Sequence, residues 1–190
     1  MARHRDPELE ERILTAADAL WRRGGEKALT MRAVAKAAGT NTPAVYRRFK
    51  NRQDLIRGLL FRIVERIGEH FLRGKNVLGM SEAYIDYALA APHEYQLFYT
   101  YSRILSPHKG KGQPRPIRES RPNFAIAEKV LAKELGGSPE DQTRRVLGLW
   151  ALLHGTAMLL LTKSIPDGHE EELRDACREL VRTVMSGAGK

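Results

Sequence analysis

The fold of this chain is decided by a stretch near its amino end, Thr30-Met-Arg-Ala-Val-Ala-Lys-Ala-Ala-Gly-Thr-Asn-Thr-Pro-Ala-Val-Tyr-Arg-Arg-Phe49. The spacing predicts two helices of about two turns each, joined by a few residues that contain Gly39. A turn this short makes the helices cross steeply, and small alanines at the crossing let the two backbones approach. The stretch is therefore typical of a helix-turn-helix unit, whose second helix turns one face outward.

The outward face of the second helix suits contact with DNA. Thr42, Pro43, Tyr46 and Arg47 supply hydroxyl, apolar and guanidinium groups, which can read base edges and methyl groups in a major groove. Pro43 falls in the first turn, where its missing N–H does no harm. A helical corner with an exposed basic face would show the same spacing, so both interpretations stay open at this point.

Composition and charge support a globular protein with an anionic partner. The chain has 190 residues, of which 42% are hydrophobic and 29% are charged. The formal net charge is +9, and residues 1–52 hold 12 basic against 6 acidic side chains. This concentration of charge favours nucleic acid or a membrane surface as partner. A single cysteine, Cys177, excludes a disulfide scaffold.

Two other stretches bear on location and partners. Residues 103–121 hold six basic side chains against Glu119 alone, which fits either a solvated face or a second binding surface. The most apolar run, residues 147–161, has 15 residues and contains His154, whereas a membrane-spanning helix needs about 20. No apolar run follows the basic residues at the start. We therefore expect a cytoplasmic protein without a membrane partner.

The whole chain follows a helical period, and no useful alternating strand pattern occurs in it. We predict an all-α protein of about nine helices: residues 8–23, 30–39, 42–49, 51–73, 81–91, 92–104, 118–135, 139–163 and 168–185. Residues 106–116 contain three prolines and two glycines and are expected to form a loop. The predicted domains are a three-helix DNA-binding domain, residues 1–52, linked through helix 52–73 to a larger helical domain, residues 74–190.

Catalytic and metal chemistry find little support. The six histidines lack a metal-binding spacing, and no glycine loop for phosphate is present, so we predict no cofactor, no metal and no enzyme activity. Cys177 lies on an apolar stripe and is interpreted as a core residue, with a redox sensor as the alternative. His154, on an otherwise apolar helix, is either a core histidine or a polar contact for a ligand.

The residues from Ile13 to Leu60 resemble the DNA-binding domain of the TetR family of bacterial transcriptional regulators. The likeness rests on Ala16-Ala17, Leu20, Thr30-Met-Arg-Ala-Val-Ala35, Ala37-Ala-Gly39, Pro43-Ala-Val-Tyr46, Phe49 and Asp54-Leu55. The later part is similar to one subgroup through Tyr84, Pro92-His-Glu-Tyr95, Leu97-Phe98, Trp150 and His154-Gly155. The resemblance implies a homodimer, one recognition helix per subunit, and a carboxyl-terminal domain that binds a small effector and releases double-stranded operator DNA.

Three positions depart from the family pattern. Asn41 replaces a usual serine and can still cap the recognition helix. Arg48 stands where histidine is frequent, and Arg52 stands where lysine is frequent. Arg52 is expected to meet a phosphate, and Arg32 matches a family position that can contact a base. The residues expected at the DNA are Thr30, Arg32, Asn41, Thr42, Pro43, Ala44, Tyr46, Arg47, Arg48 and Arg52.

Two further sites are predicted in the larger domain. Aromatic side chains at helical spacing form either plain core or the wall of an apolar cavity. The expected effector-binding residues are Tyr84, Tyr87, Phe98, Tyr99, Trp150, His154 and Met158. The helix over 139–163 is apolar around much of its girth, and its glycines permit close packing against a second copy of the helix. The expected dimer residues are Gly148, Leu152, Gly155 and Leu159.

Three classes of function remain at this stage. The first is a repressor that leaves its operator, an inverted repeat, when a small apolar effector binds. The second is a DNA-binding regulator without a small-molecule effector. The third is an enzyme or an interaction protein on a helical scaffold. Operator binding separates the first two from the third.

Overall fold

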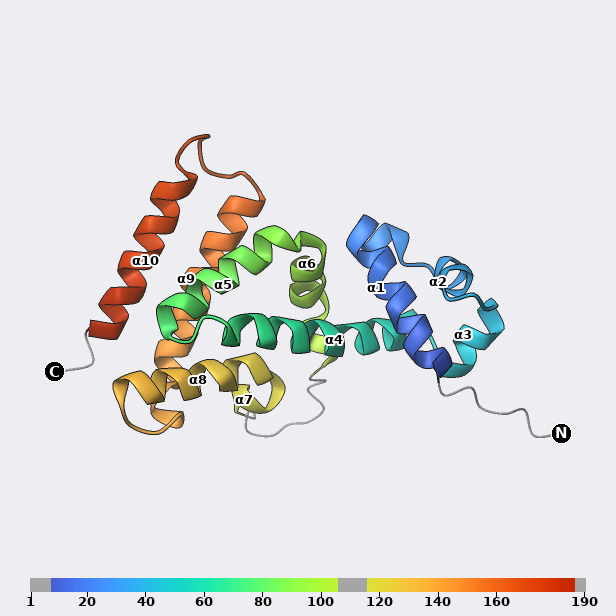
Figure 1. The fold of residues 1–190 in the computed structure, drawn as a ribbon, viewed down its shortest axis with the longest axis horizontal. Coiled ribbons are helices and arrows are strands. Elements are labelled where there is room, and N and C mark those ends of the chain that lie inside the picture. Colours follow the sequence, from blue (N-terminus) through green and yellow to red (C-terminus); the bar gives the residue numbers. More distant parts are fainter. Residues whose placement is uncertain (1–7, 106–115, 187–190) are drawn as a thin grey trace. The chain divides into compact units, whose positions relative to one another are not determined.

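The computed structural model describes residues 8–105 and 116–186, and throughout these ranges the chain folds into helices joined by short turns (Figure 1). The all-α prediction is therefore confirmed. The predicted loop over 106–116 lies almost entirely outside the described residues. The described α-helices are α1 (Glu8–Ala28), α2 (Met31–Ala37), α3 (Thr42–Arg48), α4 (Arg52–Leu72), α5 (Val77–Ala90), α6 (Pro92–Tyr101), α7 (Ile117–Ser120), α8 (Pro122–Leu135), α9 (Thr143–Leu161) and α10 (Glu170–Ser186), with 3-10 turns at Ser102–Ile104 and Glu140–Gln142.

Local start and stop signals place the amino-terminal helices as predicted. The regular helix of α1 is interrupted at Gly24 and Gly25, whose backbone angles are not helical. Gly39 takes a φ of 63° in the turn between α2 and α3, a conformation that costs glycine little. Asn51 caps α4, because its Oδ1 accepts a hydrogen bond of 2.9 Å from the Asp54 amide.

The start of α5 differs from the prediction. The helix begins at Val77 and is capped by Asn76, whose Oδ1 accepts from the Gly79 amide at 2.8 Å. Ser81 is not the cap: it lies inside the helix and donates back to the Val77 carbonyl. Gly79 does not end a helix but permits a close approach, since a Cβ there would stand 2.2 Å from the Gly74 carbonyl oxygen.

The chain packs into two compact units that do not coincide with the two domains expected from the sequence. Among described residues, the first unit comprises 8–63 and 93–105, and the second comprises 64–92 and 116–186. Residues 93–105, which hold most of α6, thus pack with the helix-turn-helix. The boundary falls inside α4, so this helix contributes to both units.

The helices α1 to α4 contribute buried side chains to the core of the first unit, and alanines among them let the helices pack closely. The inner side of the helix-turn-helix is closely packed, because Val34, Ala35, Ala38, Val45 and Phe49 are all buried. The buried side chains of these four helices include Ile13, Ala17, Trp21, Val34, Ala35, Val45, Phe49, Leu55, Ile56 and Leu59.

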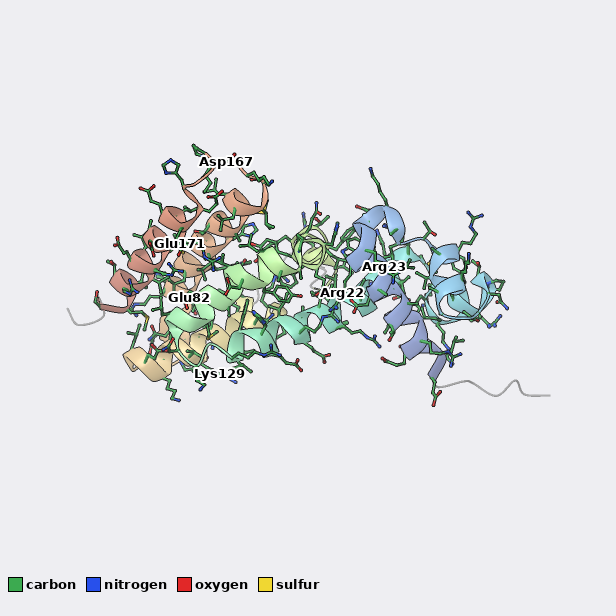
Figure 2. The ribbon with its side chains drawn as sticks, turned by 45° about the horizontal axis from the view of Figure 1, so that its top comes forward. Arg22, Arg23, Glu82, Lys129, Asp167 and Glu171 are labelled. Carbon is green, nitrogen blue, oxygen red and sulfur yellow. The ribbon has the colours of Figure 1, made fainter. Side chains whose placement is uncertain are left out.

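The second unit is a bundle in which α9 packs against α5, α8 and α10. Arg178 forms an ion pair with Glu82 at 3.2 Å, which connects α10 to α5, and a second ion pair with Glu171 on its own helix at 2.8 Å. Figure 2 labels both glutamates. Cys177 is buried on the inner side of α10, as expected for a core residue.

The stretch Glu140–Leu161, which includes α9, has the length and composition of a membrane span, with a mean hydropathy of 1.2. The sequence-based estimate had counted only the 15 apolar residues from 147. A single such helix is weak evidence for a membrane protein, because helices of a soluble core have the same properties. Here α9 packs against α5, α8 and α10, and 28% of this apolar window is buried in the single chain.

Candidate DNA-binding site and its surroundings

The recognition helix α3 is fixed at both ends. At its start, Asn41 accepts a hydrogen bond of 2.9 Å from the Ala44 amide, and Pro43 lies in the first turn. At its end, the Phe49 amide donates to the Val45 carbonyl, and both side chains are buried. The caps at both ends and the buried residues of its inner side therefore fix the orientation of the outer side of α3.

The outer face of α3 carries the groups expected at DNA. Pro43 and Arg47 are exposed, and Tyr46 is 50% exposed although it is a large aromatic side chain. Thr42 is half-buried at one edge of this face. We refer to Thr42, Pro43, Tyr46 and Arg47 as the α3 face. It offers a flat apolar ring, a guanidinium group and a hydroxyl, all suited to base edges and methyl groups.

Ala44 does not belong to this face. Its side chain is only 3% exposed, and its amide is already bound by Asn41. Neither its methyl group nor its N–H is presented to DNA. The prediction for Ala44 is wrong because position 44 falls on the inward side of a helix that packs on α2.

The two DNA contacts predicted at the preceding helix, Thr30 and Arg32, have different surroundings in the structure. Thr30 caps α2, with its hydroxyl accepting a hydrogen bond of 3.1 Å from the Ala33 amide. Arg32 is exposed on the first turn. Thr30 therefore has a structural role of its own, and Arg32 remains the predicted base contact of α2 with an exposed side chain.

Arg52 makes three contacts within the first unit. Its guanidinium donates to the Leu29 carbonyl at 3.1 Å, to the Glu26 carboxylate at 3.2 Å and to the Glu26 carbonyl at 3.2 Å. The hydroxyl of Tyr101 also donates to Glu26, and this bond, with the charge of Arg52, holds the pKa of Glu26 below its ordinary value. Arg52 thus ties the start of α4 to the end of α1, and its phosphate contact stays a prediction.

Sequence reasoning missed the polar contacts between α1 and α6. The indole Nε1 of Trp21 donates to the His93 carbonyl at 2.6 Å. Arg22 forms an ion pair with Glu94, whose side chain is only 2% exposed (Figure 2 shows Arg22). A buried carboxylate needs such a partner, but 72 residues separate the two, so no local pattern could reveal the pair.

Four of the predicted effector residues are buried or half-buried in the second unit, and Tyr84, Tyr87 and Trp150 have aromatic neighbours there. Tyr84 stacks on Phe71 with ring centroids 5.5 Å apart, and Tyr87 lies 5.6 Å from His70. These contacts join α5 to the later half of α4.

Trp150, on α9, meets the ring of Phe124 on α8 edge to face, with centroids 6.3 Å apart. His154 is half-buried one turn further along α9. Burial lowers its pKa below the ordinary value of 6.5, so its ring is neutral at pH 7. It can therefore act as a hydrogen-bonding group without a charge.

The other three predicted effector residues are placed elsewhere. Phe98 and Tyr99 belong to the first unit, where their rings contact each other and Tyr99 also contacts Tyr95. Met158 is 39% exposed on the outward side of α9. Met158 lies one turn after His154 on α9, and its role as a cavity wall stays a prediction.

The outward side of α9 is apolar and contains the predicted dimer residues. Gly148, Gly155 and Leu159 are exposed there, while Leu152 is half-buried at its edge. A Cβ on either glycine would meet no atom within 4 Å. We call this surface the α9 face; its exposed apolar and glycine members are Leu147, Gly148, Ala151, Gly155, Met158 and Leu159, and the exposed Arg144 lies at its amino-terminal end.

No group of three or more His, Cys, Asp or Glu side chains that could hold a metal ion occurs in the described part of the chain.

Comparison with known families now identifies the chain. Residues 13–59 match the model of bacterial regulatory proteins of the tetR family, and residues 77–184 match that of the tetracyclin repressor-like C-terminal domain. The chain belongs to the TetR family. Members of this family are DNA-binding transcriptional regulators, which bind operators and typically form homodimers.

Individual relatives agree with this membership. An uncharacterised HTH-type transcriptional regulator of Mycobacterium tuberculosis is 29% identical over 164 residues, covering 83% of this chain and 72% of the relative. A TetR-family transcriptional regulator from Streptomyces coelicolor superposes with a TM-score of 0.62 at 25% identity, covering 95% of this chain and 99% of the other. A protein of unknown function from Rhodococcus sp. RHA1 has the same fold, with a TM-score of 0.72 at 18% identity and full coverage of both chains.

Proposed function

We propose that this TetR-family regulator is a homodimeric repressor that binds an inverted-repeat operator through two copies of α3 and releases it when a small molecule binds in the second unit. The observation that carries the proposal is the α3 face, in which Tyr46 and Arg47 are exposed on a helix fixed at both ends. We place this action in the cytoplasm, where bacterial DNA is found.

The α9 face supports the dimer. Six exposed residues that are apolar or glycine lie along one side of a helix, and the two glycines leave room for a second backbone. Pairing this face with its copy gives a two-fold dimer. A two-fold dimer presents two recognition helices in opposite directions, which explains why the expected operator is an inverted repeat.

The aromatic contacts in the second unit support an effector site next to α4. Tyr84 and Tyr87 hold the later half of α4 from α5, and Asn123 on α8 donates to the Val64 carbonyl of α4 at 3.2 Å. Gly68 lets α8 approach, because a Cβ there would stand 2.9 Å from Asn123 Oδ1. A ligand lodged among these side chains would displace α4, whose earlier half belongs to the helix-turn-helix unit.

The experiment is footprinting of the purified chain on the DNA upstream of its own gene. We expect a protected inverted repeat, and we expect a bound small molecule to abolish the protection. Trp150→Ala and His154→Ala should weaken the response to that molecule while leaving operator binding intact. Absence of any protected site contradicts the DNA-binding assignment, and a footprint that no ligand alters favours the regulator without an effector.

A further inference from the structure

The second unit buries a carboxylate that sequence analysis did not single out. Glu128 lies on the inner stripe of α8, between Phe124 and Leu131, and is 1% exposed. Charged side chains are rarely buried to this extent unless each of their atoms has a partner.

Only one of its two oxygens is satisfied. Oε1 accepts hydrogen bonds from the Thr143 hydroxyl at 2.6 Å and from the Arg118 guanidinium at 3.2 Å. Oε2 is buried and has no hydrogen-bond partner among the described residues. Arg118 is also shared with Glu140, so one cation serves two carboxylates and leaves this corner with an excess of negative charge.

The helical geometry places this oxygen beside the aromatic residues proposed for the effector. Thr143 and Trp150 are seven residues apart on α9, which is about two turns, so both point toward the same side. Glu128 meets the first of them, and Phe124, one turn away on α8, meets the second with its ring. Glu128 therefore lies between α8 and α9, on the same sides of these helices as Phe124 and Trp150.

We propose that Glu128 Oε2 anchors a hydrogen-bond donor of the effector, a hydroxyl or a protonated amine, while an apolar ring system of the same molecule packs against Phe124 and Trp150. This inference rests on the proposed effector site and specifies the chemistry of its ligand. It adds a polar head group to the small apolar effector expected from the sequence, because a ligand without a donor would leave the buried oxygen unpaired. An anionic ligand is disfavoured, since it would face the carboxylate directly.

The test uses three probes with one ring system and different head groups: 1-naphthylmethanol, 1-naphthylmethylamine and 1-naphthoate. Isothermal titration calorimetry of each probe against the full chain should give at least tenfold tighter binding for the alcohol and the amine than for the carboxylate. In Glu128→Gln, which keeps the shape and removes the charge, the preference for the amine over the carboxylate should fall at least tenfold. Equal affinities in the unsubstituted chain, or no binding of any probe, overturn the proposal.

The matched control is Glu140→Gln. Glu140 shares Arg118 with Glu128 but is exposed, so its loss changes the local charge and leaves Oε2 in place. We expect the order of the three probes to persist in this variant. A shift as large as that in Glu128→Gln would mean that the field of the cluster, rather than a contact at Oε2, sets the preference, and this outcome also overturns the proposal.

The order of the probes in the unsubstituted chain is decisive even if Glu128→Gln proves unstable. Failure of the anchor is distinguishable from failure of the effector site. If Trp150→Ala weakens all three probes equally and Glu128→Gln changes nothing, the site stands and Glu128 binds only water. If Trp150→Ala leaves an amine preference that Glu128→Gln removes, the anchor stands and the aromatic wall was wrongly assigned.

Discussion

The α3 face and the α9 face are both exposed in a single chain, yet their chemistry differs completely. The α3 face presents Tyr46 and Arg47, long side chains with groups that reach outward. The α9 face presents leucines and glycines, which are short or apolar and lie close to the helix surface. Long side chains with polar ends can enter the grooves of DNA, whereas an apolar surface with small residues can pack closely against a second helix. The comparison teaches that the partner of an exposed helix is specified by how far its side chains extend as well as by their charge.

The largest effect is expected from a charge placed on the α9 face, which should act on dimer formation and operator binding. Gly155→Glu should leave the subunit folded, because its Cβ meets nothing within 4 Å, but it should separate the dimer by placing two carboxylates together. Loss of two-site attachment should weaken operator binding on the order of 100-fold or more. Light scattering and operator titration measure the two effects. Lys129→Glu, an exposed change on α8 of the same unit, is the control and should remain dimeric; a dimeric Gly155→Glu would contradict the assignment (Figure 2 shows Lys129).

A change on the α3 face should act on sequence preference rather than assembly. Arg47→Ala should remove about 1–3 kcal/mol of discrimination between operator and random DNA, the value of a two-pronged contact to guanine. Binding to random DNA should change much less. Arg32→Ala, on α2, is the comparison, since a small rotation of the unit would exchange the two roles. Titration of both variants on operator and scrambled duplexes decides between them, and an unchanged ratio in both excludes base reading by these arginines.

Arg52 lies outside both faces. Its substitution distinguishes a role in the stability of the fold from a contact with a DNA phosphate. Arg52→Ala removes three hydrogen bonds to the end of α1 and should lower the free energy of unfolding by about 1 kcal/mol, because the group is partly exposed. It should also reduce the salt slope of DNA binding by about one unit. Arg52→Lys should restore the slope but not the stability, since lysine cannot make the same set of bonds. A stable Arg52→Ala with a reduced slope would leave the phosphate contact as its sole role.

The smallest expected effect is on the pH dependence of stability, through His154 on α9. The pKa of His154 is lowered by burial in the folded state from its ordinary value of 6.5, so the unfolded chain binds more protons as the solution becomes acidic. Stability is therefore full above about pH 6.5 and declines as pH falls below it. His154→Gln should flatten this decline in urea unfolding between about pH 5 and 7. His169→Gln, at an exposed position on the surface, is the control; identical slopes in all three proteins would contradict the prediction.

The helix-turn-helix was predictable because its determinants are local. Gly39, Asn41 and Asn51 act within three or four residues of their own positions, so their chemistry fixes the turn and both caps. Ala44 was misassigned because residue type alone does not tell the inward from the outward side of a helix of seven residues. The predicted start at residue 81 was four residues late, because the helix begins at Val77 and Gly79 lies inside it, where it accommodates the backbone of Gly74.

The contacts of the second unit were less predictable because they join distant residues. The ring pair of Phe124 and Trp150 follows from the packing of α8 on α9. Glu128 carries a charge that composition assigns to the surface, and only the arrangement of three helices buries it. Aromatic spacing indicated which helices matter here, but it did not show that Met158 is exposed in the single chain.

The open space around Gly148 and Gly155 has a consequence for how related regulators diverge. Because a Cβ at either position would meet no other described atom within 4 Å, small substitutions there should leave the folding of the subunit nearly unchanged and, if the α9 face forms the proposed dimer, should act on pairing instead. After a gene duplication, two copies of such a regulator can therefore stop forming mixed pairs by changing these positions alone. Each daughter protein would keep its fold, its recognition helix and its ligand, and it would lose only the ability to pair with its sibling.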